Sequence, residues 1–218
     1  QKTGAAVVFN AFFREGPGRY YNAMWMAESN HRPASLIYRK HHLVPFGEFV
    51  PTGFRWFVDA LGIPMADQLR GPVGGDSFDV AGIQAAGGIC YENMFGEELR
   101  HAWDKANPGF ILNTANLGWF TDAVLPQFTA MSAMRARETA RPLIQAVQNA
   151  HSALIGPDGK THRLASKGAQ NLDMTVVTAT GSPTPFVRYG HWPLIGLLVV
   201  LLASCLTLAF RVVRRQQA

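Results

Sequence analysis

Charged residues are absent from one long stretch of this sequence. Residues 192–210, WPLIGLLVVLLASCLTLAF, contain no Asp, Glu, Lys or Arg. A helix of this length spans about 28 Å, close to the hydrocarbon thickness of a bilayer. The stretch is apolar on all sides over this whole length, which argues against a buried core helix. The sequence therefore predicts one membrane-spanning helix over residues 191–211.

The residues that flank this stretch predict its orientation. Trp192 stands at one end, and Arg211, Arg214 and Arg215 follow the other end. Trp favours the membrane interface, and Lys and Arg gather on the cytoplasmic side. We therefore expect residues 1–190 to form an extracytoplasmic domain and residues 212–218 to form a basic cytoplasmic tail.

A secretory signal is also missing. The opening residues, QKTGAAVVFNAFF, lack a basic segment, an apolar segment and a cleavage site. An extracytoplasmic domain needs an export signal or an earlier membrane span. We therefore expect the sequence to be the C-terminal fragment of a longer protein.

Cysteine is scarce, because the sequence contains only Cys90 and Cys205. Cys205 lies within the predicted membrane span, so it cannot pair with Cys90 in an aqueous domain. Disulfides are common in extracytoplasmic proteins, and a free thiol there is more often functional than structural. Cys90 is therefore the first candidate for chemistry.

Basic stripes and metal-binding motifs are absent as well. The formal net charge is +5, but Lys and Arg are spread along the chain, which excludes a nucleic-acid-binding stripe. The seven histidines show no ligand spacing such as HExxH, so we expect no metal and no organic cofactor. With 48% hydrophobic and 16% charged residues, the composition is typical of a globular domain.

Short apolar runs alternate with helical patterns, which favours a layered α/β domain. One hairpin is predicted to turn at Ala81-Gly82, with a second strand that delivers Cys90 at its end. Pro142 is expected to kink or end the longest helical pattern. The expected strands are residues 4–13, 18–28, 36–38, 108–116 and a last one from residue 172, with a second hairpin around residues 157–159 and helices over residues 92–106 and 126–150.

The segment of residues 52–72, TGFRWFVDALGIPMADQLRGP, fits neither pattern well. It is either an amphipathic helix packed in the core or a lid that shields an apolar substrate or touches the bilayer. In the second interpretation Trp56 and Phe57 contact lipid. The sequence leaves both interpretations open.

Three polar residues form a candidate catalytic set: Lys40, Glu48 and Cys90. Each follows a probable strand end, where α/β enzymes place reacting groups. A thiol becomes a nucleophile when a base takes its proton or a cation favours the thiolate. A lysine beside it, together with the peptide N–H of Tyr91, stabilises the oxyanion formed by attack on a carbonyl.

Two motifs around these residues are specific. KHHLVPFGEFVP, residues 40–51, and GGICYE, residues 87–92, closely resemble motifs of the apolipoprotein N-acyltransferases, membrane members of the nitrilase (carbon–nitrogen hydrolase) superfamily. ARETARPL, IGPDG and the RYGHWPL that leads into the apolar stretch are also similar to that family. The resemblance covers almost the whole chain in the right order.

The resemblance implies a four-layer αββα sandwich, N-terminally incomplete here, that carries a Glu–Lys–Cys triad. It makes Cys90 the nucleophile, Lys40 the oxyanion-stabilising lysine and Glu48 an additional acidic residue. Tyr91 and Glu92 would shape the pocket around the thiol. Trp119, with Trp56 and Phe57, is expected to bind substrate. No residue matches the family's general-base glutamate, and the N-terminal membrane region of the family has no counterpart either.

The activity that the resemblance implies is a two-step acyl transfer. Cys90 takes a fatty acyl chain from a membrane phospholipid as a thioester and passes it to the N-terminal amine of diacylglyceryl-cysteine on an apolipoprotein. The implied location is a bacterial inner membrane, with the catalytic domain in the periplasm. Two alternatives stay open: a membrane-anchored amidase that hydrolyses a small amide, and a non-catalytic envelope scaffold.

Overall fold

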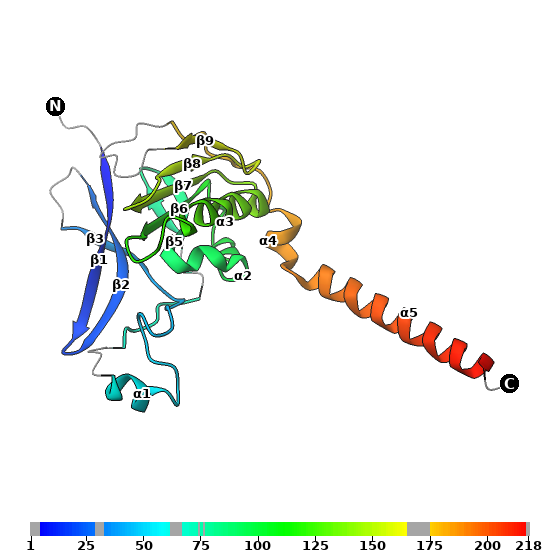
Figure 1. Cartoon of the computed structure of the whole chain (residues 1–218). Coiled ribbons are helices and arrows are strands. Elements are labelled where there is room, and N and C mark those ends of the chain that lie inside the picture. The colour runs from blue at the N-terminus through cyan, green and yellow to red at the C-terminus, as the bar shows by residue number, and fades with distance from the viewer. Residues whose placement is uncertain are drawn as a thin grey trace.

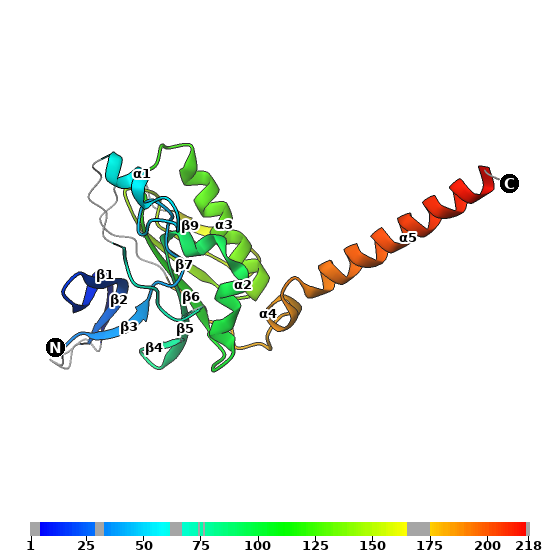
Figure 2. The ribbon, with the colours of Figure 1, turned by 90° about the horizontal axis from the view of Figure 1, so that it is seen from below.

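The protein consists of a two-sheet domain and a long C-terminal helix that extends away from it (Figure 1). The structure is a computed structural model, and it describes residues 5–28, 33–61, 67–73, 75, 77–164 and 175–216. Helices cover one face of the larger sheet, and the smaller sheet lies against its other face (Figures 1 and 2). The α/β class predicted from the sequence is confirmed.

The smaller sheet is antiparallel, with three strands in the order β1-β2-β3. Its strands confirm the three that apolar and aromatic runs predict at the start of the chain. β1 and β2 form a hairpin at Pro17-Gly18, where Gly18 has φ +68. The strands are β1 (Ala6–Gly16), β2 (Arg19–Glu28) and β3 (Ser35–Arg39).

The larger sheet has six strands in the order β4-β5-β6-β7-β8-β9. β5, β6 and β7 are parallel, whereas the outer pairs are antiparallel. Both predicted hairpins are confirmed, as β4–β5 and β8–β9. The strands are β4 (Phe78–Val80), β5 (Ile83–Ile89), β6 (Phe110–Asn116), β7 (Leu143–Gln148), β8 (Ala153–Ile155) and β9 (Thr161–Leu164).

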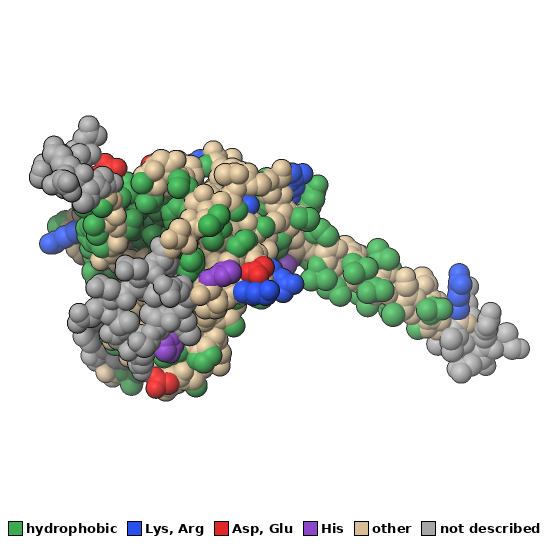
Figure 3. Space-filling view, turned by 90° about the horizontal axis from the view of Figure 1, so that it is seen from above, with side chains coloured by type: hydrophobic (Ala, Val, Ile, Leu, Met, Phe, Trp, Pro, Cys, Tyr) green, Lys and Arg blue, Asp and Glu red, His purple; other side chains and the backbone are tan. Residues whose placement is uncertain are grey.

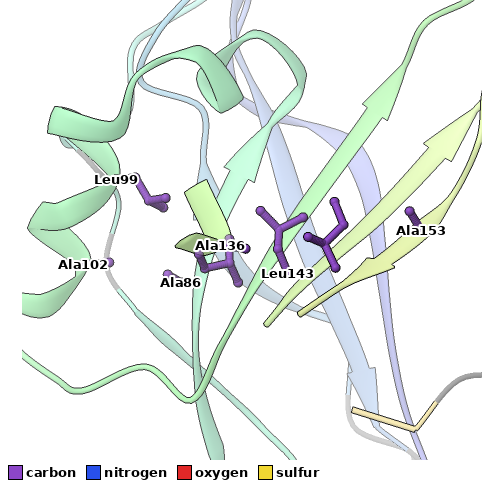
Figure 4. Close-up of a cluster of buried hydrophobic side chains, with 8 residues drawn as sticks. Ala86, Leu99, Ala102, Ala136, Leu143 and Ala153 are labelled. Carbon is purple, nitrogen blue, oxygen red and sulfur yellow. The ribbon is translucent and has the colours of Figure 1, made fainter. Parts of the chain in front are cut away.

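Each face of the larger sheet has its own hydrophobic core, because successive side chains of a strand point to opposite faces. On β5, Ala85 and Ile89 pack toward the smaller sheet, against Met24 and Tyr38. Ala86 points the other way. It joins a cluster between the larger sheet and the helices (Figure 4), formed with Leu99, Ala102, Ile111, Ala136, Leu143, Ala153 and Ile155.

The helix expected over residues 92–106 is interrupted. It consists of a 3-10 turn η1 (Cys90–Met94), a short α2 (Gly96–Leu99) and a second 3-10 turn η2 (Arg100–Trp103). Phe95 leaves the helical region with φ −110 and ψ 80. Gly96 is packed so closely against Arg135 and Glu138 that an added Cβ would lie 2.7 Å from the Glu138 carboxylate.

The long helical pattern ends before its proline. α3 (Val124–Thr139) has Pro126 in its first turn and stops at Ala140, which adopts the left-handed conformation with φ +51. Pro142 follows, and the chain enters β7. The prediction that Pro142 kinks or ends the helix is therefore confirmed as an ending.

The expected last strand is wrong for the residues that the structure describes. Residues 172–174 lie outside them, and residues 175–184 form neither strand nor helix. One backbone bond, from the Ala179 N–H to the Gly109 carbonyl, and the side chain of Arg141 hold this segment. The buried Arg141 also bonds Pro108 and Asn107. Side-chain hydrogen bonds thus take the place of a strand ladder.

Two short helices and one long one complete the chain: α1 (Arg55–Ala60), α4 (Pro185–Tyr189) and α5 (Trp192–Gln216). Within α5, Trp192–Ala209 is long and apolar enough to cross a membrane, by length and composition, and none of it is buried against the domain. Hydrophobic side chains cover most of its visible surface (Figure 3). The helix continues to Gln216, past the apolar stretch.

Candidate active site

Cys90 lies on a sharp turn between β5 and η1. It is half-buried and has φ +54, a conformation that non-glycine residues rarely adopt. The glycines before it are needed for close packing, because a Cβ at Gly87 would lie 2.7 Å from the Phe78 ring and one at Gly88 3.3 Å from Asn113. The prediction that the hairpin's second strand delivers Cys90 at its end is confirmed.

Lys40 directly follows β3, and its side chain is only 1% exposed. Its Nζ lies 2.7 Å from Oε2 of Glu48. The same carboxylate accepts hydrogen bonds from the Val44 N–H at 2.9 Å and from Nδ2 of Asn22 at 3.1 Å. A buried ammonium needs such a partner, because an unpaired charge there is costly. Glu48 therefore holds Lys40 and the loop after β3 in one conformation.

The charges of this pair act on the Cys90 thiol. Burial raises the pKa of Cys90, Lys40 lowers it, and Glu48 raises it again. The peptide N–H of Tyr91 also lowers the pKa of Cys90, because it favours the thiolate. The resting thiol is therefore protonated at neutral pH and has a cation and an N–H donor beside it. This is the arrangement in which a base that takes the proton produces a stabilised thiolate.

Glu92 is a structural anchor, which the sequence did not reveal. Its buried carboxylate accepts hydrogen bonds from the N–H groups of His41 at 2.7 Å, His42 at 3.0 Å and Ile89 at 2.7 Å, and from the Tyr38 hydroxyl at 2.9 Å. Burial raises the pKa of Glu92, against the effect of these four donors. The carboxylate ties the chain after Lys40 to the turn that carries Cys90.

A ring cluster supports the same turn. The His42 ring stacks on Phe95 with centroids 3.6 Å apart, and its centroid lies 5.5 Å from that of Tyr91. Nδ1 of His42 lies 2.8 Å from Oε1 of Glu98. His42 thus links the chain after Lys40 to the residue that follows Cys90.

The residues predicted to bind substrate lie at the surface. Trp119 is 88% exposed, on the loop after β6, at the same edge of the sheet as Cys90. In α1, Trp56 is 69% and Phe57 44% exposed, and only Val58 is buried. The interpretation of residues 52–72 as a core helix is therefore wrong for the described part, residues 52–61 and 67–72. Contact of these aromatic residues with substrate stays a prediction.

A small pocket lies behind the turn that carries Cys90, between β5 and α2. Tyr38, Glu92, Phe95 and Glu98 line it, and Cys90 does not. The pocket thus belongs to the support of the turn. Within the described residues, no group of three His, Cys, Asp or Glu side chains is arranged to hold a metal ion.

The chain is similar to known proteins along most of its length. The family model for carbon–nitrogen hydrolases matches residues 1–181. The chain is 38% identical over 208 residues to the apolipoprotein N-acyltransferase of Ralstonia nicotianae, which covers 94% of this chain and 39% of that protein. It is 40% identical over 179 residues to the Bordetella bronchiseptica protein of the same name, covering 78% and 33%. The chain thus spans less than half the length of these relatives.

Solved structures show the same fold. A carbon–nitrogen hydrolase from Helicobacter pylori matches with a TM-score of 0.57 at 16% identity, covering 77% of this chain and 60% of that one. An amidase from Nesterenkonia, modified by acrylamide at its active site cysteine, matches with a TM-score of 0.57 at 17% identity, covering 89% and 70%.

The first prediction concerns the Glu92 anchor. Glu92→Gln replaces one acceptor oxygen by an amide donor, so at least one of the three backbone N–H groups loses its partner. We expect the free energy of unfolding to fall by about 1–3 kcal/mol, measured by urea titration of the detergent-solubilised protein. Glu98→Gln, which keeps an acceptor for His42, is the matched control and should cost less than about 1 kcal/mol. Equal losses would contradict the anchor role.

The second prediction concerns the Cys90 thiol. Its alkylation by iodoacetamide should reach half-maximal rate at a pH above that of an unperturbed cysteine. Lys40→Met removes the cation that favours the thiolate, so this midpoint should rise further. Glu48→Gln removes the opposing anion, so the midpoint should fall. Mass spectrometry of the Cys90 peptide measures the alkylation rate of each protein as a function of pH. Midpoints that shift in the same direction in the two variants would contradict the opposing effects of Lys40 and Glu48 on the thiol.

Proposed function

The chain belongs to the carbon–nitrogen hydrolase family, and from this membership we propose that it is the catalytic part of an apolipoprotein N-acyltransferase. The reaction moves a fatty acyl chain from a membrane phospholipid to the N-terminal amine of diacylglyceryl-cysteine on an apolipoprotein. Relatives up to 40% identical carry this name. The observation that carries the proposal is the buried Lys40–Glu48 pair beside the half-buried Cys90.

In the first step the Cys90 sulfur attacks the ester carbonyl of the phospholipid. The carbonyl electrons move to the oxygen, where the Lys40 ammonium and the Tyr91 N–H stabilise the negative charge. Collapse of this intermediate forms the thioester. The lysophospholipid leaves with the proton that Cys90 gave up.

In the second step the free α-amine of the apolipoprotein attacks the thioester carbonyl. The amide forms, the Cys90 thiolate leaves, and the proton lost by the amine returns the site to its resting state. A thioester suits this sequence, because a thiolate is a good nucleophile in the first step and a good leaving group in the second.

A general base is required, because burial raises the pKa of the Cys90 thiol. The family uses a glutamate for this role, and no residue of this sequence matches its motif. We assign Glu48 to the positioning of Lys40, since its carboxylate bonds Lys40, Val44 and Asn22.

The membrane setting belongs to the same proposal. Residues 191–211 span a bacterial inner membrane, residues 1–190 face the periplasm, and the basic residues 212–218 lie in the cytoplasm. The three layers of the domain are part of a four-layer αββα sandwich. Trp119 and the aromatic side chains of α1 contact the lipid substrate, which their exposure supports.

A membrane-anchored amidase is the second candidate. The amidase from Nesterenkonia shares the fold, and in one of its structures the acetamide moiety of fluoroacetamide is covalently added at the active site cysteine. When such an enzyme hydrolyses an amide, the amine leaves as the thioester forms and water then resolves the thioester. The apolar α5 and the exposed aromatic residues of α1 favour the acyltransferase, because a small-amide hydrolase has no use for a lipid-facing surface.

The third prediction tests the thioester. Full-length protein purified from membranes and given dioleoyl phosphatidylethanolamine without an acceptor should carry an oleoyl mass on the Cys90 peptide. Hydroxylamine should remove it, and Cys90→Ser should abolish hydroxylamine-sensitive labelling. An unmodified thiol in folded protein would favour the amidase, and lipoprotein acylation by the Cys90→Ser variant at the wild-type rate would exclude both enzymes.

The fourth prediction tests the lid. Trp56→Ser with Phe57→Ser should raise the KM for phospholipid in vesicles by about tenfold or more, because two apolar contacts with lipid are lost. Thermal stability should stay unchanged, because both side chains are exposed in the domain. Phe12→Ser, at an exposed aromatic residue of β1, is the matched control and should leave the KM as it is. A large fall in melting temperature without a change in KM would contradict the lid.

A further inference from the structure

The junction between the domain and α5 is built from a small set of polar contacts. α4 contacts α3 and η2, and Val187 is its buried residue. Thr184 caps α4 through the Val187 N–H and donates its hydroxyl to the Glu138 carbonyl of α3. α4 lies against the helical layer, and α5 then runs straight away from the domain (Figures 1 and 2).

Glu97 of α2 binds the residues that join α4 to α5. Its Oε1 accepts the His191 N–H at 2.6 Å and lies 2.7 Å from Nδ1 of the same residue. Its Oε2 accepts Nε of Arg100 at 2.6 Å. Desolvation opposes the charge of Glu97, but the bonds from Arg100 and His191 outweigh it, so its pKa is lowered. The carboxylate is therefore charged at neutral pH.

Gly190 completes this contact. It has φ +57 and ψ −137, which side-chain-bearing residues rarely adopt. An added Cβ would collide with the Glu97 carboxylate. The connection from α4 to α5 thus requires glycine at this position, for its conformation and for the space beside Glu97.

The direction of α5 depends on this junction, because Trp192–Ala209 buries nothing against the domain. α2 is in turn close to the nucleophile: Gly96–Leu99 follows η1, which begins at Cys90. η1 is held to α3 by the bond from Nδ2 of Asn93 to the Ser132 hydroxyl, at 2.7 Å. The start of α5 is therefore connected to Cys90 through His191, Glu97 and the backbone of α2 and η1.

We propose that Glu97, Gly190 and His191 form a latch that fixes the direction of α5 and thereby the position of Cys90 relative to the membrane surface. The proposal rests on the proposed function, in which α5 spans the bilayer and the acyl donor is a phospholipid. The three residues are positioning residues, since none touches Cys90. An exposed ion pair contributes little to stability, so the latch selects a direction and adds little to the stability of the fold.

The fifth prediction measures this direction. Spin labels at Val177→Cys on the domain and Leu208→Cys on α5, both at exposed positions, report their separation in nanodiscs, with Cys90→Ala and Cys205→Ser as background. We expect one narrow distance distribution in this reference protein and broad ones after Glu97→Gln or Gly190→Ala. The control is Asp104→Asn, which breaks a similar pair, His101–Asp104 at 2.9 Å, without touching α5. It should leave the distribution narrow.

The kinetic part uses two acyl donors. With dioleoyl phosphatidylethanolamine in nanodiscs, both latch variants should form the Cys90 thioester about ten- to a hundredfold more slowly, as expected for a reacting group displaced by about 1 Å. With p-nitrophenyl butyrate, which reaches the site from water, their rates should stay within about twofold, because the local geometry at Cys90 is intact. Asp104→Asn should match the wild type with both donors.

The outcomes separate the latch from the proposed function. Unchanged distance distributions would overturn the latch, and so would broad distributions with unchanged phospholipid kinetics. Equal losses with both donors would also overturn it, since they indicate damage to the site itself. If wild-type protein forms no phospholipid thioester, the proposed function fails. The proposal that the latch positions Cys90 for a lipid donor then fails with it. The distance measurement still decides whether the junction fixes the direction of α5.

Discussion

The geometry of the candidate active site depends on one buried carboxylate. Glu92 accepts four hydrogen bonds, from Tyr38 of β3, from the backbone after Lys40 and from the last residue of β5. Those donors come from both sheets, so the carboxylate sets the distance between the strand that delivers Lys40 and the strand that delivers Cys90. A neutral side chain of the same shape cannot accept all four bonds, which is why the charge matters as well as the position.

A second constraint is the burial of Lys40. An ammonium without water is tolerated because Glu48 lies 2.7 Å away and is itself held by two further donors. The two charges of the pair oppose each other: Lys40 lowers the pKa of the Cys90 thiol and Glu48 raises it. Lys40 is thereby ready to meet negative charge when it develops on a substrate oxygen, without ionising the thiol in advance. The two glycines before Cys90 and the positive φ of Cys90 complete this arrangement by presenting the sulfur on a tight turn.

Much of the fold could be predicted from the sequence, because strand alternation and turn residues are local signals. The first three strands, both hairpins and the end of α3 near Pro142 follow from such signals. The break at Phe95 could not be predicted, since it depends on contacts of Glu92 and Gly96 with residues far along the chain. The strand expected after residue 172 is wrong in the described residues for a similar reason: carbonyls of this segment accept hydrogen bonds from the side chains of Arg141 and Asn107, which lie far away in the sequence. In the site, the grouping of Lys40, Glu48 and Cys90 followed from their places after predicted strands and from the family resemblance, whereas the anchor role of Glu92 is visible only once its four partners are in place.

The raised pKa of Cys90 has a consequence for the chemical lifetime of the protein. Peroxides and disulfides attack thiolates far faster than thiols. A half-buried thiol that stays protonated until a base acts on it is therefore a poor target for these oxidants between catalytic cycles. In the proposed acyltransferase, the burial that makes a base necessary thus also protects the sulfur from sulfenic acid and mixed-disulfide formation.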